Sequence, residues 1–419
     1  MPALEGWRGH GVDVAVIGAG AAGIAAARHL ATLRPDLAVL VLEAADRIGG
    51  RALTLPGGDG IDLGCGWLHG ARDNAWTAIA EADGFVVDRQ PAPWNRDSAG
   101  NDPAADARRA AGDAMDAFFA RIEARSPTEP DGPMSAYLEP GNRWNGFIGA
   151  VATYINGAEL ECASALDYTR YRPGRPPDWR VRDGYGRLIA HHGAPVPVVL
   201  STPVTRIEHG RAGAVTLDTE RGTLRCRAAV VTVSSTCLAE GAIRFDPALP
   251  DKQAAASGVP LGVANKIFLD LAVPEALPEE VYVHGASDRV ATGAYHLRPL
   301  GRPRIECYYG GAFARHIEAL APDAAAAVAI DELVGHFGAD LRRHLALRAR
   351  SAWAGDPWAR GSYSYARPGA AGARAILAAP VADKLFFAGE ACSPHRFSTA
   401  HGAYETGLAA ATAASAALA

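Results

Sequence analysis

Apolar residues follow two different periods along this chain, and the change of period marks its first elements. The β-branched run DVAVI at 13–17 predicts a short buried strand, and the run IAAARHLATL predicts a helix that ends before Pro35. The apolar run LAVLVLE at 37–43 predicts a second buried strand. Strand, helix and strand in this order predict a βαβ unit with parallel pairing, and therefore an α/β fold.

The remainder of the pattern is less regular. Residues 104–125 and the alanine-rich stretch 324–328 predict helices. Residues 201–233 contain strand-like runs separated by glycine turns, which predicts antiparallel pairing. The segment LFFAGEACSPHRFSTAHGAYETG at 385–407 predicts a strand, a polar turn and a new helix. Because no linker divides the chain, we expect two interleaved domains.

Composition narrows the class of protein. The chain has 419 residues, of which 49% are hydrophobic and 21% charged, so it can bury a large core, and intrinsic disorder is disfavoured. A net charge of −5 argues against a nucleic-acid partner. The six cysteines show no CxxC and no metal-ligand spacing, so we expect mostly buried thiols in a reducing compartment and no metal site. No leader peptide or membrane span is recognisable, so we expect a cytoplasmic protein without membrane contact.

A glycine fingerprint follows the first predicted strand. Gly18, Gly20 and Gly23 form GxGxxG between a strand and a helix, which is the arrangement that binds a dinucleotide pyrophosphate. Glu43, twenty residues after Gly23, ends the second strand and would accept hydrogen bonds from a ribose diol. These residues predict FAD or NAD binding; the alternative is a glycine-rich turn in a domain that binds no nucleotide.

Motifs farther along the chain favour FAD. EAADRIGGR, with Gly50 and Arg51, resembles the glutathione-reductase-like FAD enzymes, and especially the flavin-containing amine oxidases. FAGE and HGAYETG near the C-terminus match the same family, and SAWAGDPWARGSYSYARPGA at 351–370 is similar to polyamine oxidases and lysine-specific histone demethylases. Further matching blocks occur in the same order at 62–74, 201–209 and 243–271.

This resemblance implies an FAD-binding Rossmann-like domain interleaved with an α+β substrate-binding domain. The expected FAD-binding domain comprises 1–75, 195–248 and 350–419. The expected substrate-binding domain comprises 76–194 and 249–349.

The resemblance also implies how FAD is held. It places Gly50 and Arg51 on the flavin side of the dinucleotide and the Val204 backbone at the adenine. Glu390 would bond the ribityl or pyrophosphate region, and the helix start at Thr399 would face the flavin pyrimidine carbonyl. Ser362 stands where monoamine oxidases carry the cysteine that bonds to flavin, which implies non-covalent FAD. The expected aromatic neighbours of the isoalloxazine are Trp67, Trp353 and Trp358.

Four residues are expected at the reaction centre. Lys266 would contact flavin N5 through a water, and Tyr363 would form one aromatic wall, with Thr399 at the position of the opposite wall. His69 matches a histidine near the substrate channel of polyamine oxidases. The alternatives are a salt-bridged structural lysine, a core tyrosine and a histidine bonded to backbone. Glu159 and Glu161 could meet a distal ammonium, or could be solvated surface carboxylates.

The implied reaction is oxidation of an amine. Hydride would pass from the carbon next to nitrogen to flavin N5, the imine would hydrolyse, and O2 would reoxidise the flavin to give hydrogen peroxide. A polyamine or secondary amine is the favoured substrate. The alternative is an amino acid or specialised amine, whose carboxylate would need a cation such as Arg170 or Arg172. A chromatin-binding role is disfavoured because the oxidase body takes up nearly the whole chain, and an inactive FAD-binding scaffold remains an alternative.

Two positions depart from the family pattern. Ala45 replaces an arginine that often contacts the cofactor, and serines in VVTVSSTCLAEG replace the usual proline and leucine. The serines therefore lead us to expect a differently shaped loop in the VVTVSSTCLAEG segment.

Overall fold

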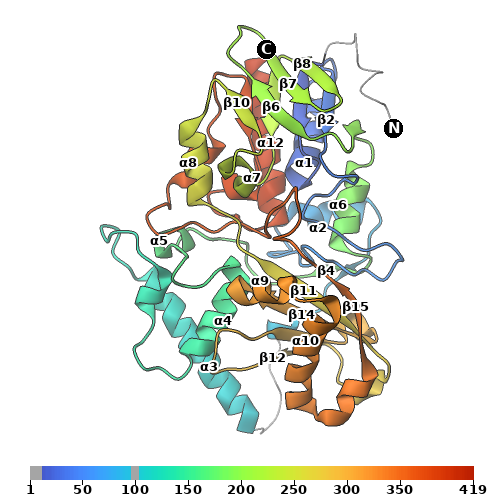
Figure 1. Ribbon diagram of the computed structural model, residues 1–419, viewed down its shortest axis with the longest axis vertical. Coiled ribbons are helices and arrows are strands. Elements are labelled where there is room, and N and C mark those ends of the chain that lie inside the picture. The colour runs from blue at the N-terminus through green and yellow to red at the C-terminus, as the bar shows by residue number, and fades with distance from the viewer. Residues whose placement is uncertain (1–11, 96–102) are drawn as a thin grey trace.

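The computed structural model describes residues 12–95 and 103–419 (Figure 1). The expectation about a leader peptide concerns residues 1–11, which lie outside the described residues. The upper part of Figure 1 contains the elements near both ends of the sequence, and the lower part contains helices and strands from its middle. The chain therefore passes between the two parts more than once.

A parallel sheet of five strands forms the centre of the upper part. Its order is β16-β9-β1-β2-β5, and every neighbouring pair is parallel. The middle strands are buried along their whole length, as the uninterrupted apolar runs predicted. The α/β Rossmann-like fold is therefore confirmed. The strands are β1 (Val14–Ile17), β2 (Val39–Leu42), β5 (Val198–Val199), β9 (Ala228–Val231) and β16 (Leu385–Phe387).

The first and last long helices pack against each other beside this sheet. These are α1 (Ala21–Leu33) and α12 (Ala400–Ala417), drawn in blue and red in Figure 1. Their contact depends on small residues: a Cβ at Gly407 would lie 2.2 Å from the carbonyl oxygen of Ala22. The two ends of the chain thus form one packed unit.

A small sheet of order β10-β6-β7-β8 adjoins the parallel sheet. Its pairs β6–β7 and β7–β8 are antiparallel, as the glycine turns predicted. The expectation of antiparallel pairing was wrong for the end of that segment, because β9 joins the parallel sheet, where all four of its residues are buried. The strands are β6 (Val204–Glu208), β7 (Val215–Thr219), β8 (Gly222–Cys226) and β10 (Arg244–Asp246).

A larger antiparallel sheet organises the lower part. Its order is β12-β13-β14-β11-β15. One face packs its apolar side chains against α9 (Gly311–Ala319) and α10 (Pro322–Phe337). The other face carries the polar and aromatic residues of the site described below. The strands are β11 (Ala264–Leu271), β12 (Val281–His284), β13 (Ala294–Leu297), β14 (Arg304–Gly310) and β15 (Leu345–Arg350).

Most of the other helices lie around these sheets. The helices predicted at 104–125 and 324–328 are present as α3 (Pro103–Glu123) and within α10. The remaining α-helices are α2 (Ala75–Ala82), α4 (Asn145–Asn156), α5 (Ala165–Tyr168), α6 (Tyr185–Gly193), α7 (Ser235–Ala239), α8 (Pro250–Gly258) and α11 (Ala373–Ala378), and a two-stranded sheet pairs β3 (Val87–Asp88) with β4 (Arg180–Val181).

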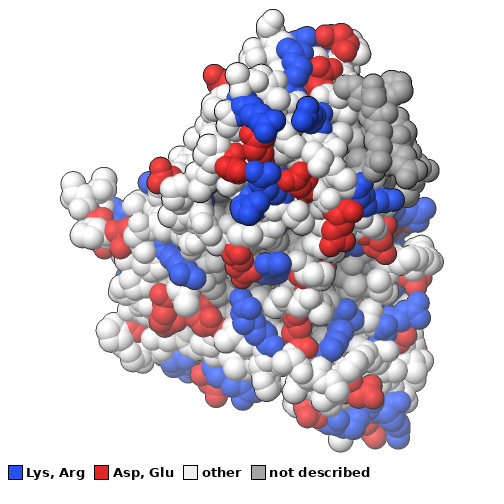
Figure 2. Space-filling model, turned by 45° about the horizontal axis from the view of Figure 1, so that its top comes forward, with Lys and Arg blue, Asp and Glu red and all other residues white. Residues whose placement is uncertain are grey.

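Charges of both signs are mixed on the surface. Figure 2 shows Lys and Arg side chains interspersed with Asp and Glu on the visible face, without a broad basic area. Several of these charges form exposed ion pairs, such as Arg360 with Glu240. None of the helices in the two described ranges combines the length and apolar character needed to cross a membrane.

Candidate active site

A cavity of about 2480 Å³ runs between the upper and lower parts of the molecule. It is lined by the loop after β1, the start of α12, and the polar face of the larger sheet. Of the catalytic and cofactor-binding residues that the sequence predicted, all but Gly23 line this cavity. They are Gly18, Gly20, Glu43, Gly50, Arg51, Trp67, His69, Val204, Lys266, Trp353, Trp358, Tyr363, Glu390 and Thr399.

The glycine loop has the close backbone packing that a pyrophosphate site needs. Gly18 has φ +105°, which a residue with a side chain rarely adopts. Gly23 lies beneath the cavity wall, where a Cβ would approach the Gly18 carbonyl oxygen to 1.9 Å. This contact holds the start of α1 against β1, so the first-turn N–H groups face the cavity.

Glu43 is a buried carboxylate at the end of β2. Its Oε2 accepts a hydrogen bond from the Ala19 N–H at 2.6 Å, and its Oε1 accepts one from the Ala45 N–H at 2.8 Å. Burial raises the pKa of Glu43, and these backbone donors offset part of that rise. No lysine, arginine or histidine of the described residues forms an ion pair with it. Hydroxyl donors from a ribose would therefore complete its hydrogen bonding.

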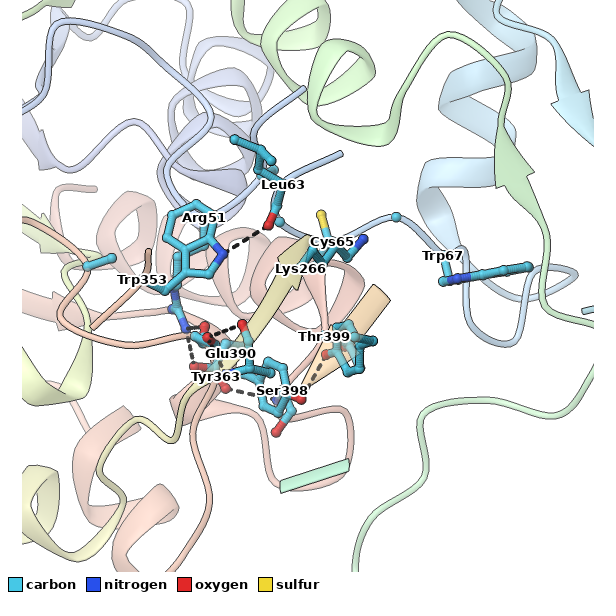
Figure 3. A pocket seen from close by; sticks show the side chains of 18 of the residues that line it. Arg51, Leu63, Cys65, Trp67, Lys266, Trp353, Tyr363, Glu390, Ser398 and Thr399 are labelled. Atoms are coloured by element: carbon cyan, nitrogen blue, oxygen red, sulfur yellow. Dashed lines mark hydrogen bonds and ion pairs between the residues drawn. The ribbon is translucent and has the colours of Figure 1, made fainter. Parts of the chain in front are cut away.

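Arg51 and Glu390 join the two ends of the sequence across the cavity. The Arg51 Nη1 donates to Glu390 Oε1 at 2.8 Å and to the Ser362 carbonyl at 2.8 Å, and the first of these contacts is drawn in Figure 3. Glu390 also accepts from the Ser364 hydroxyl at 2.7 Å and the Ser398 N–H at 2.8 Å. Burial would raise the pKa of Glu390, but Arg51 and Ser364 hold it below its usual value.

These contacts give Glu390 a role within the protein, and its predicted bond to the cofactor stays a prediction. Its oxygens already accept hydrogen bonds from protein donors, whereas the sequence predicted bonds to the cofactor. Glu390 therefore fixes Arg51 and the turn that leads into α12.

Thr399 begins α12 as its N-cap. Its Oγ1 accepts from the Gly402 N–H at 3.0 Å and donates to the Arg396 carbonyl at 2.6 Å. The helix start expected at Thr399–Gly402 is confirmed by these bonds. The partial positive charge of the N-terminus is directed at the cavity, where it would stabilise developing negative charge.

Trp353 and Trp358, two of the three tryptophans predicted near the flavin, differ in burial. Trp353 is buried, and its Nε1 donates to the Leu63 carbonyl at 2.9 Å, a contact drawn in Figure 3. Trp358 also borders the cavity but is 45% exposed. Of these two, Trp353 is therefore the one fixed as part of a rigid wall.

Lys266 on β11 lies between two acidic residues. Its Nζ is 2.7 Å from Glu306 Oε1 and donates to the Asp62 backbone carbonyl at 3.0 Å. β14 brings Glu306 to the same face of the sheet, so Lys266 has the ion pair that the alternative of a salt-bridged lysine predicted. Burial lowers the pKa of Lys266, but Glu306 and Asp62 outweigh burial and raise it above its usual value. The Asp62 carboxyl has its pKa raised to about 6, mainly by burial.

Tyr363 belongs to a hydrogen-bonded group of phenols. Its hydroxyl lies 3.0 Å from that of Tyr308 and donates to the Tyr154 carbonyl. Burial raises the pKa of both Tyr308 and Tyr363, so both remain neutral phenols. The ring of Tyr363 therefore forms a fixed part of the cavity wall.

His69 lies at a more open part of the cavity. Its side chain is 41% exposed, and Nδ1 is 3.4 Å from Asp178 Oδ2. Burial would raise the pKa of Asp178, but the hydrogen bond and charge of His69 hold it lower. The alternative of a histidine bonded only to backbone is therefore wrong, because His69 contacts the Asp178 side chain.

The other candidates for substrate contact lie elsewhere. Glu159, Glu161, Arg170 and Arg172 are all absent from the cavity lining. Glu159 instead accepts a hydrogen bond from the Ala312 N–H, and Arg170 donates to the Ala371 carbonyl.

Sequence reasoning missed several residues on the cavity wall. Glu306 and Tyr308 alternate on β14 in RIECYYG, and Tyr282 and His284 alternate on β12 in VYVH. Alternation with apolar residues assigns each pair to one face of its strand. The alternation could have identified these residues as sharing one face of their strands. The sequence did not reveal which strands pair, so it could not place that face on the cavity.

These features fit FAD. The glycine loop, the buried Glu43 and the positively polarised start of α12 lie on one cavity that is long enough to reach from β1 to Lys266. The fit rests on the chemistry of these groups: N–H donors for phosphates, a carboxylate for a diol and a helix N-terminus for a ring that gains negative charge.

Comparison with known proteins agrees with this geometry. The family described as flavin containing amine oxidoreductase matches residues 21–107 and 139–415. The chain is 30% identical to polyamine oxidase 2 of Arabidopsis thaliana, with 95% of this chain and 87% of that protein covered. It is 27% identical to polyamine oxidase 4 of Oryza sativa subsp. japonica, with 98% and 90% covered.

A solved structure of putrescine oxidase bound to putrescine has the same fold. The TM-score is 0.76 at 19% identity, and the match covers 96% of this chain and 98% of that one. From the family match and the residues on this cavity, the chain belongs to the flavin-containing amine oxidoreductases and is an enzyme with FAD as its cofactor.

Proposed function

We propose that this enzyme oxidises a polyamine or another secondary amine and uses O2 as the electron acceptor. The observation that carries the proposal is that one cavity joins the dinucleotide loop to Lys266, Tyr363 and the start of α12. The similarity to polyamine oxidases over nearly the whole chain supports the choice of substrate class.

When bound, FAD supplies hydride acceptance from the carbon next to the amine nitrogen, with return of the electrons to O2 as hydrogen peroxide. The amine needs a free lone pair, and the residues of the cavity favour that state. The buried ring of Trp353 and the half-buried rings of Tyr308 and Tyr363 provide surroundings in which a neutral amine is stabilised relative to an ammonium ion.

Lys266 contributes a fixed positive charge on the cavity wall. Its ion pair with Glu306 and its bond to the Asp62 carbonyl hold the ammonium in place. A cation held this way stabilises negative charge that develops beside it and can orient a water molecule through its remaining N–H. Tyr363 confines the substrate from the neighbouring wall, and the start of α12 contributes its partial positive charge.

The division into domains also remains a proposal. We propose that 1–75, 195–248 and 350–419 form the FAD-binding domain, and that 76–194 and 249–349 form the substrate-binding domain. The parallel sheet within the first set and the larger antiparallel sheet, most of which lies within the second, support this division. The six free cysteines support a reducing compartment such as the cytoplasm.

Peroxide release from an amine panel tests the function. Holoenzyme is incubated with spermine, spermidine, their acetylated forms, simple monoamines and amino acids. We expect peroxide from one or more polyamines and at least a hundredfold lower kcat/KM in Lys266→Met, equivalent to about 2.7 kcal/mol of lost transition-state stabilisation. Activity with amino acids alone would support the alternative substrate, and no activity with any amine would contradict the proposal.

A further inference from the structure

The carboxylate of Asp62 caps a helix to which Asp62 does not belong. Helix α6 begins at Tyr185 after Gly184, which has no side chain to accept hydrogen bonds from the first turn. Asp62 Oδ2 accepts from the Tyr185 N–H at 2.9 Å, and Oδ1 accepts from the Gly186 N–H at 3.1 Å. The partial positive charge of the helix N-terminus favours an ionised carboxylate in this position.

Thr54 attaches the same carboxylate to the helix a second time. Its Oγ1 donates to Asp62 Oδ1 at 2.5 Å and accepts from the Arg187 N–H at 2.8 Å. The backbones are also closely packed, because a Cβ at Gly186 would lie 2.6 Å from the nitrogen of Leu53. Since Asp62 is buried, water does not compete for these bonds. The segment that carries Thr54 and Asp62 is therefore fixed against the start of α6.

The backbone of Asp62 holds Lys266. Its carbonyl accepts from Lys266 Nζ at 3.0 Å, and the other partner of this ammonium is Glu306 at 2.7 Å. The aspartate side chain is short, so a carboxylate fixed on α6 also fixes the direction of the carbonyl of the same residue. Asp62 thus connects the start of α6 to an ammonium on β11.

Asp62 and Lys266 also influence the charge of each other. Burial raises the pKa of Asp62 to about 6, and the charge of Lys266 and the bonds from Thr54 and the α6 backbone oppose this rise. Burial lowers the pKa of Lys266, but Glu306 and then Asp62 raise it. A proton on Asp62 therefore removes negative charge from beside Lys266 and an acceptor from the start of α6.

The other titratable and charged groups around Asp62 do not change their charge near pH 6, with one exception. Burial raises the pKa of Cys65 to about 12 and that of Tyr185 still further, whereas the charge of Lys266 holds the pKa of Glu306 below its usual value against the effect of burial. Arginines border a small pocket that Asp62 shares, and they stay charged. The exception is His296, which pairs with Glu306 across β13 and β14. The arginines are Arg180, Arg302 and Arg304.

We propose that Asp62 is a positioning residue for Lys266: its ionised carboxylate, anchored on the start of α6, fixes the carbonyl that holds the Lys266 ammonium at the cavity. This inference deepens the proposed function and rests on it for the contribution of Lys266 to the reaction. Activity consequently falls in acid as Asp62 takes up a proton, while Lys266 itself stays charged.

The first measurement follows Lys266 without turnover. The chain contains three lysines, Lys252, Lys266 and Lys384, so holoenzyme with carbon-13 at the lysine Cε gives three lysine signals in an NMR spectrum. Lys266→Met identifies the signal of Lys266. We expect this signal to move in one step near pH 6, where Asp62 titrates, and we expect Asp62→Asn to lack the step.

Two further substitutions keep the carboxylate and test the source of the step. Thr54→Val removes a donor that stabilises the ionised carboxylate, so the step should move to higher pH, and Thr54→Ser should return it toward its original position. His296→Gln is the matched control, because it removes the neighbouring group that titrates in the same range. The step should persist in His296→Gln.

Turnover gives an independent readout. Asp62→Asn should lower kcat about tenfold and leave the KM of the amine within about twofold, because it displaces Lys266 and leaves the walls of the cavity unchanged. The acid limb of kcat near pH 6 should be absent from the variant. Ser164→Ala removes the N-cap of α5 outside the cavity lining, and as a control for the loss of a cap it should change neither constant.

The outcomes separate this inference from the proposed function. A Lys266 signal without a step near pH 6, a step that survives in Asp62→Asn, or a step that disappears in His296→Gln overturns the role of Asp62. If Asp62→Asn does not fold, an unmoved step in Thr54→Val overturns it instead. Equal losses of kcat in Asp62→Asn and Ser164→Ala would show that Asp62 is only a cap. Peroxide from no amine overturns the proposed function, while the lysine signals still decide whether Asp62 acts on Lys266.

Discussion

Lys266 shows how neighbours from distant parts of the sequence determine the state of one side chain. Burial alone would favour the neutral amine, yet Glu306 and Asp62 keep it charged. Since the pair with Glu306 is buried on both sides, with 7% and 17% of the side chains exposed, removing one partner leaves a charge that water cannot solvate.

Glu306→Gln therefore destabilises the protein by about 3 kcal/mol. The raised pKa of Lys266 contributes stability below the usual lysine pKa, and the lowered pKa of Glu306 contributes stability above the usual glutamate pKa. The deficit should consequently be equal at pH 8 and pH 9, where Asp62 is ionised, and should shrink in strong acid as Glu306 in the wild type takes up a proton. Urea unfolding of the holoenzyme measures it.

The matched control is Glu240→Gln, which breaks the exposed pair with Arg360. Its cost should stay below about 1 kcal/mol. Equal losses in the free energy of unfolding for the two variants would show that the Lys266–Glu306 pair contributes no more to stability than an exposed ion pair.

At the scale of elements, the contact between α1 and α12 determines whether two helix starts reach the cavity together. Gly407→Val would place a side chain against the Ala22 carbonyl, which a Cβ already approaches to 2.2 Å. We expect a loss of about 3 kcal/mol in stability from overpacking, and weaker FAD binding because the starts of α1 and α12 move apart.

Thermal unfolding and titration of apoprotein with FAD measure the two effects of Gly407→Val. Ala413→Val, on an exposed position of the same helix, is the control and should change neither quantity measurably. Unchanged FAD affinity in Gly407→Val would mean that the helix contact does not position the site.

Local patterns predicted the elements that border the cavity proposed for FAD, but they did not predict sheet membership or side-chain partners. DVAVI, GAGAAG and Glu43 lie within one short stretch of the sequence. Hydrophobic periodicity and residue spacing were therefore sufficient to predict the strand, the loop and the acid. β9 was misassigned because a buried apolar strand has the same sequence pattern in either kind of sheet. Glu306 and His284 were missed because their proximity to Lys266 depends on the β11–β14–β13–β12 register, which a single sequence does not specify.

At the scale of the whole molecule, the cavity between the two parts makes folding and cofactor binding interdependent. Ser362 uses its hydroxyl to donate to the Ala264 carbonyl and accept from the Ala264 N–H, both at 2.8 Å, and offers no thiol to the flavin. We therefore expect reversible FAD binding.

Acid denaturation followed by filtration should release all flavin colour. Added FAD should raise the unfolding temperature, with a stabilisation of about 2.7 kcal/mol at a free concentration one hundred times Kd. Colour retained on the polypeptide, or an unfolding temperature that does not respond to FAD, would contradict this expectation.

The strand order of the parallel sheet has a consequence for synthesis of the protein on the ribosome. β1 lies between β2, which is translated soon after it, and β9, which is translated about two hundred residues later. β16 completes the edge only about 150 residues after β9. For most of that time the nascent chain has unpaired strand edges and α1 without its partner helix. Because such segments attract other chains, we expect the yield of folded enzyme in a cell to depend on chaperones that shield the early strands until the later ones emerge.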